Sequence, residues 1–180
     1  GLIDTPTARM NDDGILTFAF SRDELHQSYS ITYQALPWLE ATFRYSGIDG
    51  ASPFTDSAVY YDRNYGVKVR LFEEDEWYPQ VALGIRDLIG TGIYGSEYIV
   101  ASKTVGSLDA SLGIGWGRIA GDGLFDNPFG LIYDRFNTRP TTRGLADTGT
   151  FQAFYFRGKK AGLFGGLTYS FDKWPVKAMV

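Results

Sequence analysis

The sequence predicts an all-β protein, namely an antiparallel up-and-down transmembrane β-barrel of which about eight or nine strands lie within the chain. Three observations predict it. The 180 residues include 13 Phe, 12 Tyr, 4 Trp and 22 Gly, a composition that favours pleated strands and turns. Apolar and polar residues alternate along most of the chain, with the period of a strand. Finally, short and long connections alternate, as in outer-membrane barrels.

The alternation is clearest in residues 39–46, where odd positions carry Leu, Ala, Phe and Tyr and even positions carry Glu, Thr, Arg and Ser. In residues 96–104 the pattern is ambiguous. We assign Tyr98 and Val100 to the apolar face there, because Glu97 and Lys103 then share the polar face. The predicted strands are 16–21, 28–35, 39–46, 66–71, 80–86, 96–104, 108–117, 162–171 and 176–180.

The composition of the polar faces favours a barrel interior over the water-exposed face of a soluble sandwich. These faces carry Gly, Ser and Thr with isolated charges, which suits a crowded lumen where charges pair across strands. Such charges either line a path for a saccharide or form a salt-bridge network that fills a narrow lumen, and the sequence favours neither. The predicted lumen-facing residues are Glu40, Arg44, Lys68, Arg70, Arg86, Glu97, Lys103 and Asp109.

The tryptophans fall near strand ends. Trp38, Trp77 and Trp174 lie at the short-turn side, which is periplasmic in outer-membrane barrels, and Trp116 lies at the opposite side. Tryptophan concentrates at membrane–water interfaces because its ring is amphipathic. We therefore expect all four to be membrane-interface aromatics. The alternative is that they plug the ends of a soluble core.

Charge and composition exclude several function classes. A net charge of −4 argues against a nucleic-acid partner, which requires a basic surface. The chain has no cysteine and a single histidine, His26, so we expect no metal site, no cofactor and no catalytic triad. The run 73–76, Glu-Glu-Asp-Glu, is more simply explained as a solvated turn than as a cation site. Mean hydropathy is −0.17, which does not argue against a barrel with alternating strands.

Several motifs resemble those of the YjbH family of outer-membrane proteins linked to exopolysaccharide and capsule production. The similarity begins with GLIDTPTARM at residues 1–10 and continues with PWLEATFRY at 37–45 and VALGIRD at 81–87. It extends through GTG at 90–92, SEYIVASK at 96–103, GIGWG at 113–117 and FRGKKAGLFGG at 156–166.

The resemblance implies an outer-membrane location in a Gram-negative bacterium. The implied partners are the lipid bilayer, polysaccharide and other exopolysaccharide-secretion proteins. Family members are longer, so we expect residues 1–180 to be a single N-terminal portion of a barrel domain, truncated within its last strand. Nine strands is an odd number, whereas bacterial single-chain barrels close with even numbers, which agrees with this expectation. The resemblance transfers no catalytic residues.

Three functions follow as hypotheses. The first is a non-enzymatic barrel for exopolysaccharide or capsule export or assembly. The second is a soluble carbohydrate-binding β-sandwich, which predicts that the faces with Val67, Val69, Leu83 and Leu112 pack on a second sheet. The third is a barrel-borne polysaccharide hydrolase that would use the loop carboxylates Asp122 and Asp126.

Overall fold

The computed structural model describes residues 5–24, 26–48, 60–90, 92, 94–140, 150–151, 154–171 and 177–179. All nine predicted strands are present in the predicted order, together with two short strands and three 3-10 helices. The elements are β1 (Leu16–Arg22), β2 (His26–Leu36), β3 (Leu39–Ile48), β4 (Tyr60–Phe72), β5 (Gln80–Gly90), β6 (Ser96–Val105), β7 (Leu108–Gly117), η1 (Arg118–Ala120), β8 (Phe125–Asp126), η2 (Pro128–Leu131), η3 (Asp134–Asn137), β9 (Thr150–Phe151), β10 (Lys160–Ser170) and β11 (Lys177–Met179). Among the described residues, no helix is long and apolar enough to cross a membrane.

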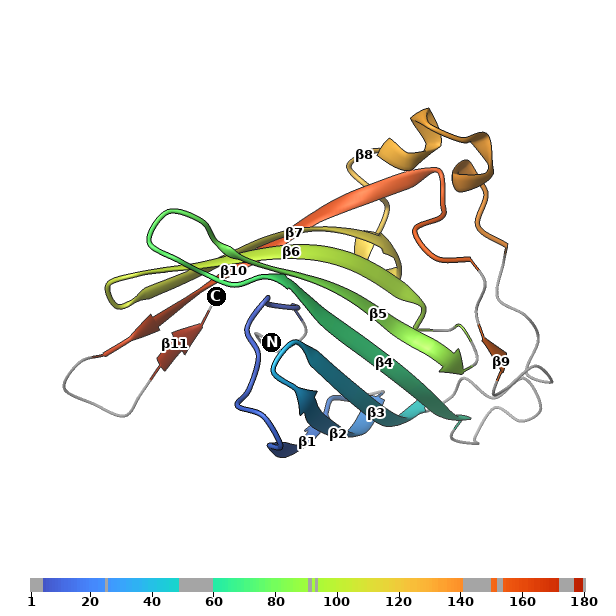
Figure 1. Cartoon of the computed structure of the whole chain (residues 1–180). Coiled ribbons are helices and arrows are strands. Elements are labelled where there is room, and N and C mark those ends of the chain that lie inside the picture. Colours follow the sequence, from blue (N-terminus) through green and yellow to red (C-terminus); the bar gives the residue numbers. More distant parts are fainter. Residues whose placement is uncertain are drawn as a thin grey trace.

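All strands belong to one antiparallel sheet. This confirms the all-β, antiparallel part of the predicted fold class. Each long strand pairs with the next along the chain, in the order β1-β2-β3-β4-β5-β6-β7-β10-β11. The short strand β8 pairs with β10, and β9 pairs with β5. The sheet is strongly curved, and the order begins at β1 and ends at β11 without a pairing between them (Figure 1). The described strands therefore form an open, up-and-down sheet.

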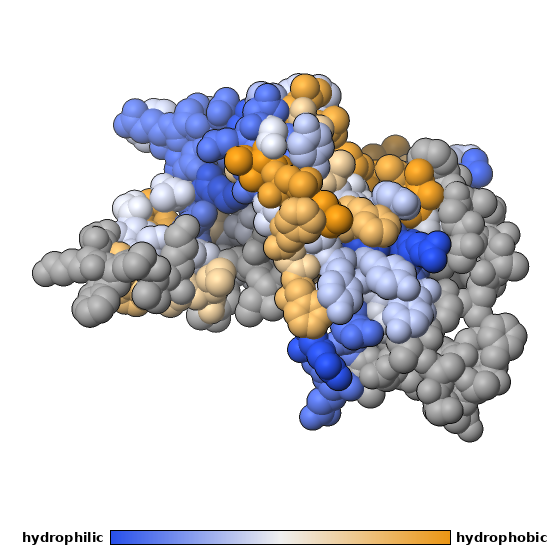
Figure 2. Space-filling model, turned by 90° about the horizontal axis from the view of Figure 1, so that it is seen from below, coloured by the Kyte–Doolittle hydropathy of each residue, from blue (hydrophilic) through white to orange (hydrophobic). Residues whose placement is uncertain are grey.

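One face of this sheet is polar and buried, and the other is apolar and exposed, which is the reverse of a water-soluble sheet. We call the face that carries Glu40, Lys68, Gly84 and Tyr98 the inner face, since these residues are aligned across β3–β6. The inner face buries polar side chains, among them Gln34, Asp62, Asn64, Lys68, Gln80, Ser102 and Ser111. The opposite, outer face exposes large apolar side chains, including Phe18 (69% exposed) and Leu112 (63% exposed). A band of hydrophobic side chains bordered by hydrophilic ones is visible on the surface in Figure 2.

A small apolar cluster lies on the inner face. It consists of Ala8, Ala82, Tyr98 and Val100, with Phe164 packed against it. Glycine makes room for its rings: a Cβ atom added to Gly84 would lie 2.1 Å from Cζ of Tyr98. The rings of Tyr98 and Phe164 meet edge to face at 6.1 Å between centroids.

This cluster shows that the predicted faces of residues 96–104 were wrong. Tyr98 and Val100 point to the inner face, and Glu97 and Lys103 belong to the outer face, because Glu97 aligns with Ile85 and Trp116. The physical reason is the glycine opposite: Gly84 leaves a hollow that the Tyr98 ring fills.

The described residues contain no second sheet packed on the outer face, as a β-sandwich would require. Leu112 is largely exposed, and Val67 and Leu83 are only partly covered. The inter-sheet core predicted by the sandwich hypothesis is therefore not found in this part of the chain.

Candidate functional site

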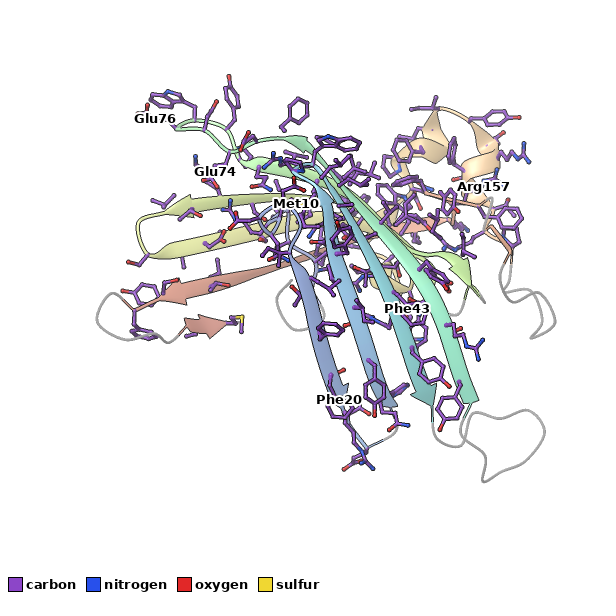
Figure 3. All side chains as sticks on the ribbon, turned by 60° about the horizontal axis from the view of Figure 1, so that its bottom comes forward. Met10, Phe20, Phe43, Glu74, Glu76 and Arg157 are labelled. Carbon is purple, nitrogen blue, oxygen red and sulfur yellow. The ribbon has the colours of Figure 1, made fainter. Side chains whose placement is uncertain are left out.

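The N-terminal segment (residues 5–14) lies against the inner face at the end of the sheet where the turns are short. Figure 1 shows it under the curve of the sheet, and Figure 3 shows Met10 in the same place. The backbone N–H of Ala8 donates to Oγ of Ser102 at 2.9 Å, and Nε2 of Gln80 donates to the Ala8 carbonyl at 2.6 Å. The N–H of Asn11 donates to Oε1 of Gln34 at 3.1 Å. Side chains from β2, β5 and β6 thus satisfy this extended backbone, as buried polar groups require.

Arg9 anchors the segment in an acidic pocket. Its guanidinium donates two hydrogen bonds of 2.9 Å to the carboxylate of Asp109 and one of 2.7 Å to Oγ1 of Thr104, and it also pairs with Glu74. The hydrogen bonds with Asp109 raise the pKa of Arg9, against the opposing effect of burial. Burial alone would raise the pKa of Glu74, but hydrogen bonds from the Thr104 N–H and from Arg9 lower it. The charged forms of both groups are therefore favoured.

The other cations of this half of the inner face are also paired. Nζ of Lys68 lies 3.0 Å from Oε1 of Glu40 and also donates to the Arg9 carbonyl at 2.8 Å. Arg70 pairs with Glu73 at 3.3 Å. Lys103, from the outer face, reaches Glu74 at 3.4 Å around the rim of the sheet. Five of the predicted lumen-facing residues, Glu40, Lys68, Arg70, Lys103 and Asp109, therefore form ion pairs within the chain, so in this half the salt-bridge hypothesis describes the structure.

The other half of the inner face, toward the long loops, is organised differently. Arginines there lie over tyrosine rings: the guanidinium of Arg86 is 5.9 Å from the Tyr98 ring centroid, and that of Arg118 is 4.7 Å from the Tyr94 ring centroid. Arg44 lies on the same face as Glu40 and is half-buried. We call Arg44, Arg86, Tyr94, Tyr98 and Arg118 the arginine–tyrosine site.

The pKa of Tyr94 is shifted by burial and by charged groups around it. Burial chiefly raises the pKa of Tyr94, and the carboxylate of Asp62 adds to this, while the charges of Arg118 and Arg44 act in the opposite direction. Asp62 is buried beside Asn64, whose Nδ2 donates to it at 3.1 Å. The site thus combines cationic donors, aromatic faces and buried acceptors, which are the groups that bind sugars and their substituents.

Asp87 closes the site at the end of β5. Its backbone has a φ of 60°, an uncommon conformation for a residue with a side chain. The side chain is 1% exposed, and Oδ2 accepts the N–H of Tyr94 at 3.2 Å. Oδ1 has no hydrogen-bond partner among the described residues and rests against Gly90, where a Cβ would lie 1.9 Å away. Gly90 therefore makes this turn sterically possible.

Sequence reasoning identified Arg44 and Arg86 but missed Asp62, Asp87, Tyr94 and Arg118. Asp62 was missed because the predicted strand began at residue 66, whereas β4 begins at Tyr60. A signal was present: Asp62 and Asn64 continue the even-numbered polar series that runs through Gly66 and Lys68. The other three lie beyond the ends of the predicted strands 80–86 and 108–117, where alternation gives no signal.

A cap formed by residues 125–140 and 154–160 covers the outer face at the loop end and changes the role of two predicted residues. Glu97 is 1% exposed and accepts hydrogen bonds from Arg139 at 2.7 and 2.9 Å and from the N–H of Phe156 at 2.9 Å. It is therefore a cap anchor and not a lumen-facing residue. Trp116 is 1% exposed, stacks on Phe129 and donates from Nε1 to Asn127 at 2.8 Å. Its indole is enclosed by protein, so it is not the interface aromatic that we predicted.

Two of the short-turn tryptophans lie in strand connections, and their location at a membrane interface stays a prediction. Trp38 and Trp77 are exposed in the β2–β3 and β4–β5 connections, Trp77 by 80%. Trp174 lies outside the described residues.

The acidic run 73–76 forms an ordered turn in which Oδ1 of Asp75 accepts the N–H groups of Trp77 and Tyr78. Among the described residues there is no group of three acidic or histidine side chains that could hold a metal ion.

The two carboxylates of the hydrolase hypothesis are both exposed. Asp126 pairs with Lys160 at 2.9 Å, and this hydrogen bond lowers the pKa of Asp126. A glycosidase general acid requires a raised pKa, so Asp126 does not have the property that this role needs. The structure gives no interaction between Asp122 and Asp126.

Two comparisons with known proteins found a match over nearly the whole chain. A family model described as exopolysaccharide biosynthesis protein YbjH matches residues 1–179. The chain is 36% identical over 182 residues to a protein of Escherichia coli strain K12 named uncharacterized lipoprotein YjbH. That alignment covers 98% of this chain and 26% of the relative, so the chain spans about a quarter of that protein's length. No solved structure matches the chain.

Proposed function

Because this chain belongs to the YjbH family of exopolysaccharide biosynthesis proteins, we propose that it is part of an outer-membrane β-barrel that serves exopolysaccharide or capsule export or assembly. The proposed role is non-enzymatic: the barrel guides or holds a saccharide and does not cleave it. Its proposed partners are the lipid bilayer, the polysaccharide and other proteins of the same secretion system.

The polarity of the two sheet faces is the observation that carries this proposal. Large apolar side chains such as Phe18, Tyr29 and Leu112 are exposed on the outer face, while Lys68, Asp62 and other polar groups are buried on the inner face. A water-soluble sheet buries its apolar face, whereas a membrane barrel presents that face to lipid. The name of the Escherichia coli relative, a lipoprotein, supports an envelope location.

The proposed barrel has its short turns at the periplasmic rim, with Trp38 and Trp77 in the interface there. Further strands of a longer protein would close the curved sheet, which agrees with the 26% of the relative that this chain covers. The saccharide would contact the inner face in its loop-end half, at the arginine–tyrosine site. The short-turn half is filled by the N-terminal segment.

A spin-label experiment tests the membrane placement. The chain has no cysteine, so Leu112→Cys and the neighbouring Ser111→Cys each give one labelling site in β7. In outer-membrane vesicles, we expect a label at position 112 to be relaxed by oxygen, which concentrates in lipid, and not by a water-soluble nickel chelate. A label at position 111 should show low oxygen accessibility. Strong relaxation by the nickel chelate at position 112 would refute the proposed membrane location.

A further inference from the structure

We propose that the arginine–tyrosine site binds the carboxylate groups of an acidic saccharide, and that Arg44 and Arg118 donate the hydrogen bonds to these carboxylates. This inference rests on the proposed function and specifies its substrate class. It starts from a contrast between the two halves of the inner face, which differ in how their cationic side chains are paired.

In the short-turn half, carboxylates of the chain neutralise the cations. Arg9 is bound by Asp109 and Glu74, and Lys68 is bound by Glu40. The cap follows the same rule, because Arg139 makes a two-pronged pair with Glu97. At Arg9, Lys68 and Arg139, a carboxylate of the chain therefore neutralises the cation.

Two arginines of the loop-end half, Arg44 and Arg118, differ from this pattern. Within the described residues, the guanidinium of Arg44 has no hydrogen bond and no ion pair, although the side chain is half-buried on a polar face. The Arg118 guanidinium has no ion pair there either; the residue is exposed, and its Cζ lies over the Tyr94 ring, 4.7 Å from the centroid. Its N–H donors are therefore available, and the donors of a guanidinium match a carboxylate in two-pronged geometry.

The surroundings of these arginines suit a sugar acid better than a small inorganic anion. Tyr94 offers an aromatic face, on which the apolar side of a pyranose ring packs. The side chains of Asn64 and Ser46 are buried close by and hold polar groups of the site in place: Asn64 donates to Asp62, and Ser46 is hydrogen-bonded to Tyr94. Asp62 and Asp87 are buried nearby, and Oδ1 of Asp87 is unpartnered within the described residues. Cationic donors and acceptors side by side fit a ligand that carries both carboxylate and hydroxyl groups.

The test uses the chain in the same vesicles and two matched probes, tetragalacturonate and its fully methyl-esterified, uncharged form. Calorimetry should show binding of the acid and at least roughly tenfold weaker binding of the ester, since one charge-assisted hydrogen-bonded pair accounts for about tenfold and the ester loses every such pair. Arg44→Gln should weaken binding of the acid by a similar factor. Arg44→Lys, which keeps the charge and loses the two-pronged geometry, should give an intermediate loss.

Arg63→Gln is the matched control. Arg63 lies on the neighbouring strand β4 but on the opposite face, where its guanidinium is 6.0 Å from the Tyr45 ring centroid. This variant should bind tetragalacturonate as the unmodified chain does.

Four results would overturn the inference: no binding of the acid, equal binding of acid and ester, an unchanged affinity in Arg44→Gln, or an equal loss in Arg63→Gln. Displacement by inorganic phosphate at the same concentration as the saccharide would also overturn it, because the site would then bind any anion. The spin-label result at position 112 is independent of these measurements, so failure of the saccharide class and failure of the membrane proposal are distinguishable.

Discussion

Arg9 and Asp109 lie a hundred residues apart in the sequence and are joined by two hydrogen bonds of 2.9 Å between guanidinium and carboxylate. This pair ties the N-terminal segment to the beginning of β7. Together with the bonds from Gln80 and Lys68, it makes the segment an integral part of the inner face.

The first prediction concerns the stability that Arg9 provides. Arg9→Gln removes the two-pronged pair and leaves Asp109 and Glu74 without their shared cation, so we expect a loss of about 1–3 kcal/mol in the free energy of unfolding. Urea unfolding followed by tryptophan fluorescence measures it. Arg22→Gln at the exposed end of β1 is the control and should change stability by less than about 0.5 kcal/mol. Equal stability of both variants would show that the Arg9 pocket contributes nothing.

The second prediction is a pH dependence that comes from Glu74. The pKa of its carboxyl is lower in the folded chain than the ordinary value of 4.5. A lowered folded-state pKa stabilises the fold above the unfolded-state pKa, and this stabilisation is lost as the pH falls through the folded-state pKa. We therefore expect the urea midpoint to fall with decreasing pH below about 4.5, and to fall less steeply in Glu74→Gln. Glu73→Gln, at a side chain 74% exposed, should keep the slope of the unmodified chain.

Much of the fold could be predicted because alternation is a local property. The nine strands depend on which residues neighbour one another along the chain, and all nine are found. The predicted face of Tyr98 was wrong because, in a segment without clear alternation, the face that a side chain occupies depends on its packing against residues of the neighbouring strands. Gly84 lies opposite Tyr98 in the register, and the hollow that it leaves accommodates the ring on the inner face.

The candidate site was predictable in part for the same reason. Arg44 and Arg86 belong to clearly alternating segments, so their face was predicted. Position 97 was misassigned because its environment depends on the cap, whose Arg139 is 42 residues away. The N-terminal segment has no alternation, and its partner Lys68 lies 59 residues further along the chain. Contacts of such separation leave no local pattern.

The third prediction tests the hollow beneath Tyr98. Gly84→Ala places a Cβ within 2.1 Å of Cζ of Tyr98, so the ring must move, and we expect a loss of about 1–3 kcal/mol from overpacking. Tyr98→Leu alone should also destabilise, because it leaves a cavity beside Val100. The loss of stability in the double variant should be smaller than the sum of the two single losses, because Tyr98→Leu removes the ring with which the new Cβ at position 84 clashes. Strict additivity would contradict direct packing of Gly84 against Tyr98.

The fourth prediction concerns Asn127, which holds the cap together. Its Oδ1 accepts Nε1 of Trp116 at 2.8 Å, and its Nδ2 donates to the carbonyls of Phe156 and Gly158, both at 2.9 Å. The side chain is 1% exposed, so Asn127→Ala leaves several buried polar groups unpaired, at a cost of about 1–3 kcal/mol for each.

This loss should fall on the cap and not on the sheet, because the partners of Asn127 lie in the cap or beneath it. We expect trypsin to cleave Asn127→Ala faster after Arg157 and Lys159, and the fluorescence of Trp116 to shift to longer wavelength as water reaches the indole. Asn137→Ala is the matched control, since its one hydrogen bond, to the Gly130 carbonyl at 3.4 Å, is exposed. If both variants are cleaved at the same rate, Asn127 does not lock the cap; if the far-ultraviolet strand signal is also lost in Asn127→Ala, the cap and the sheet unfold as one unit.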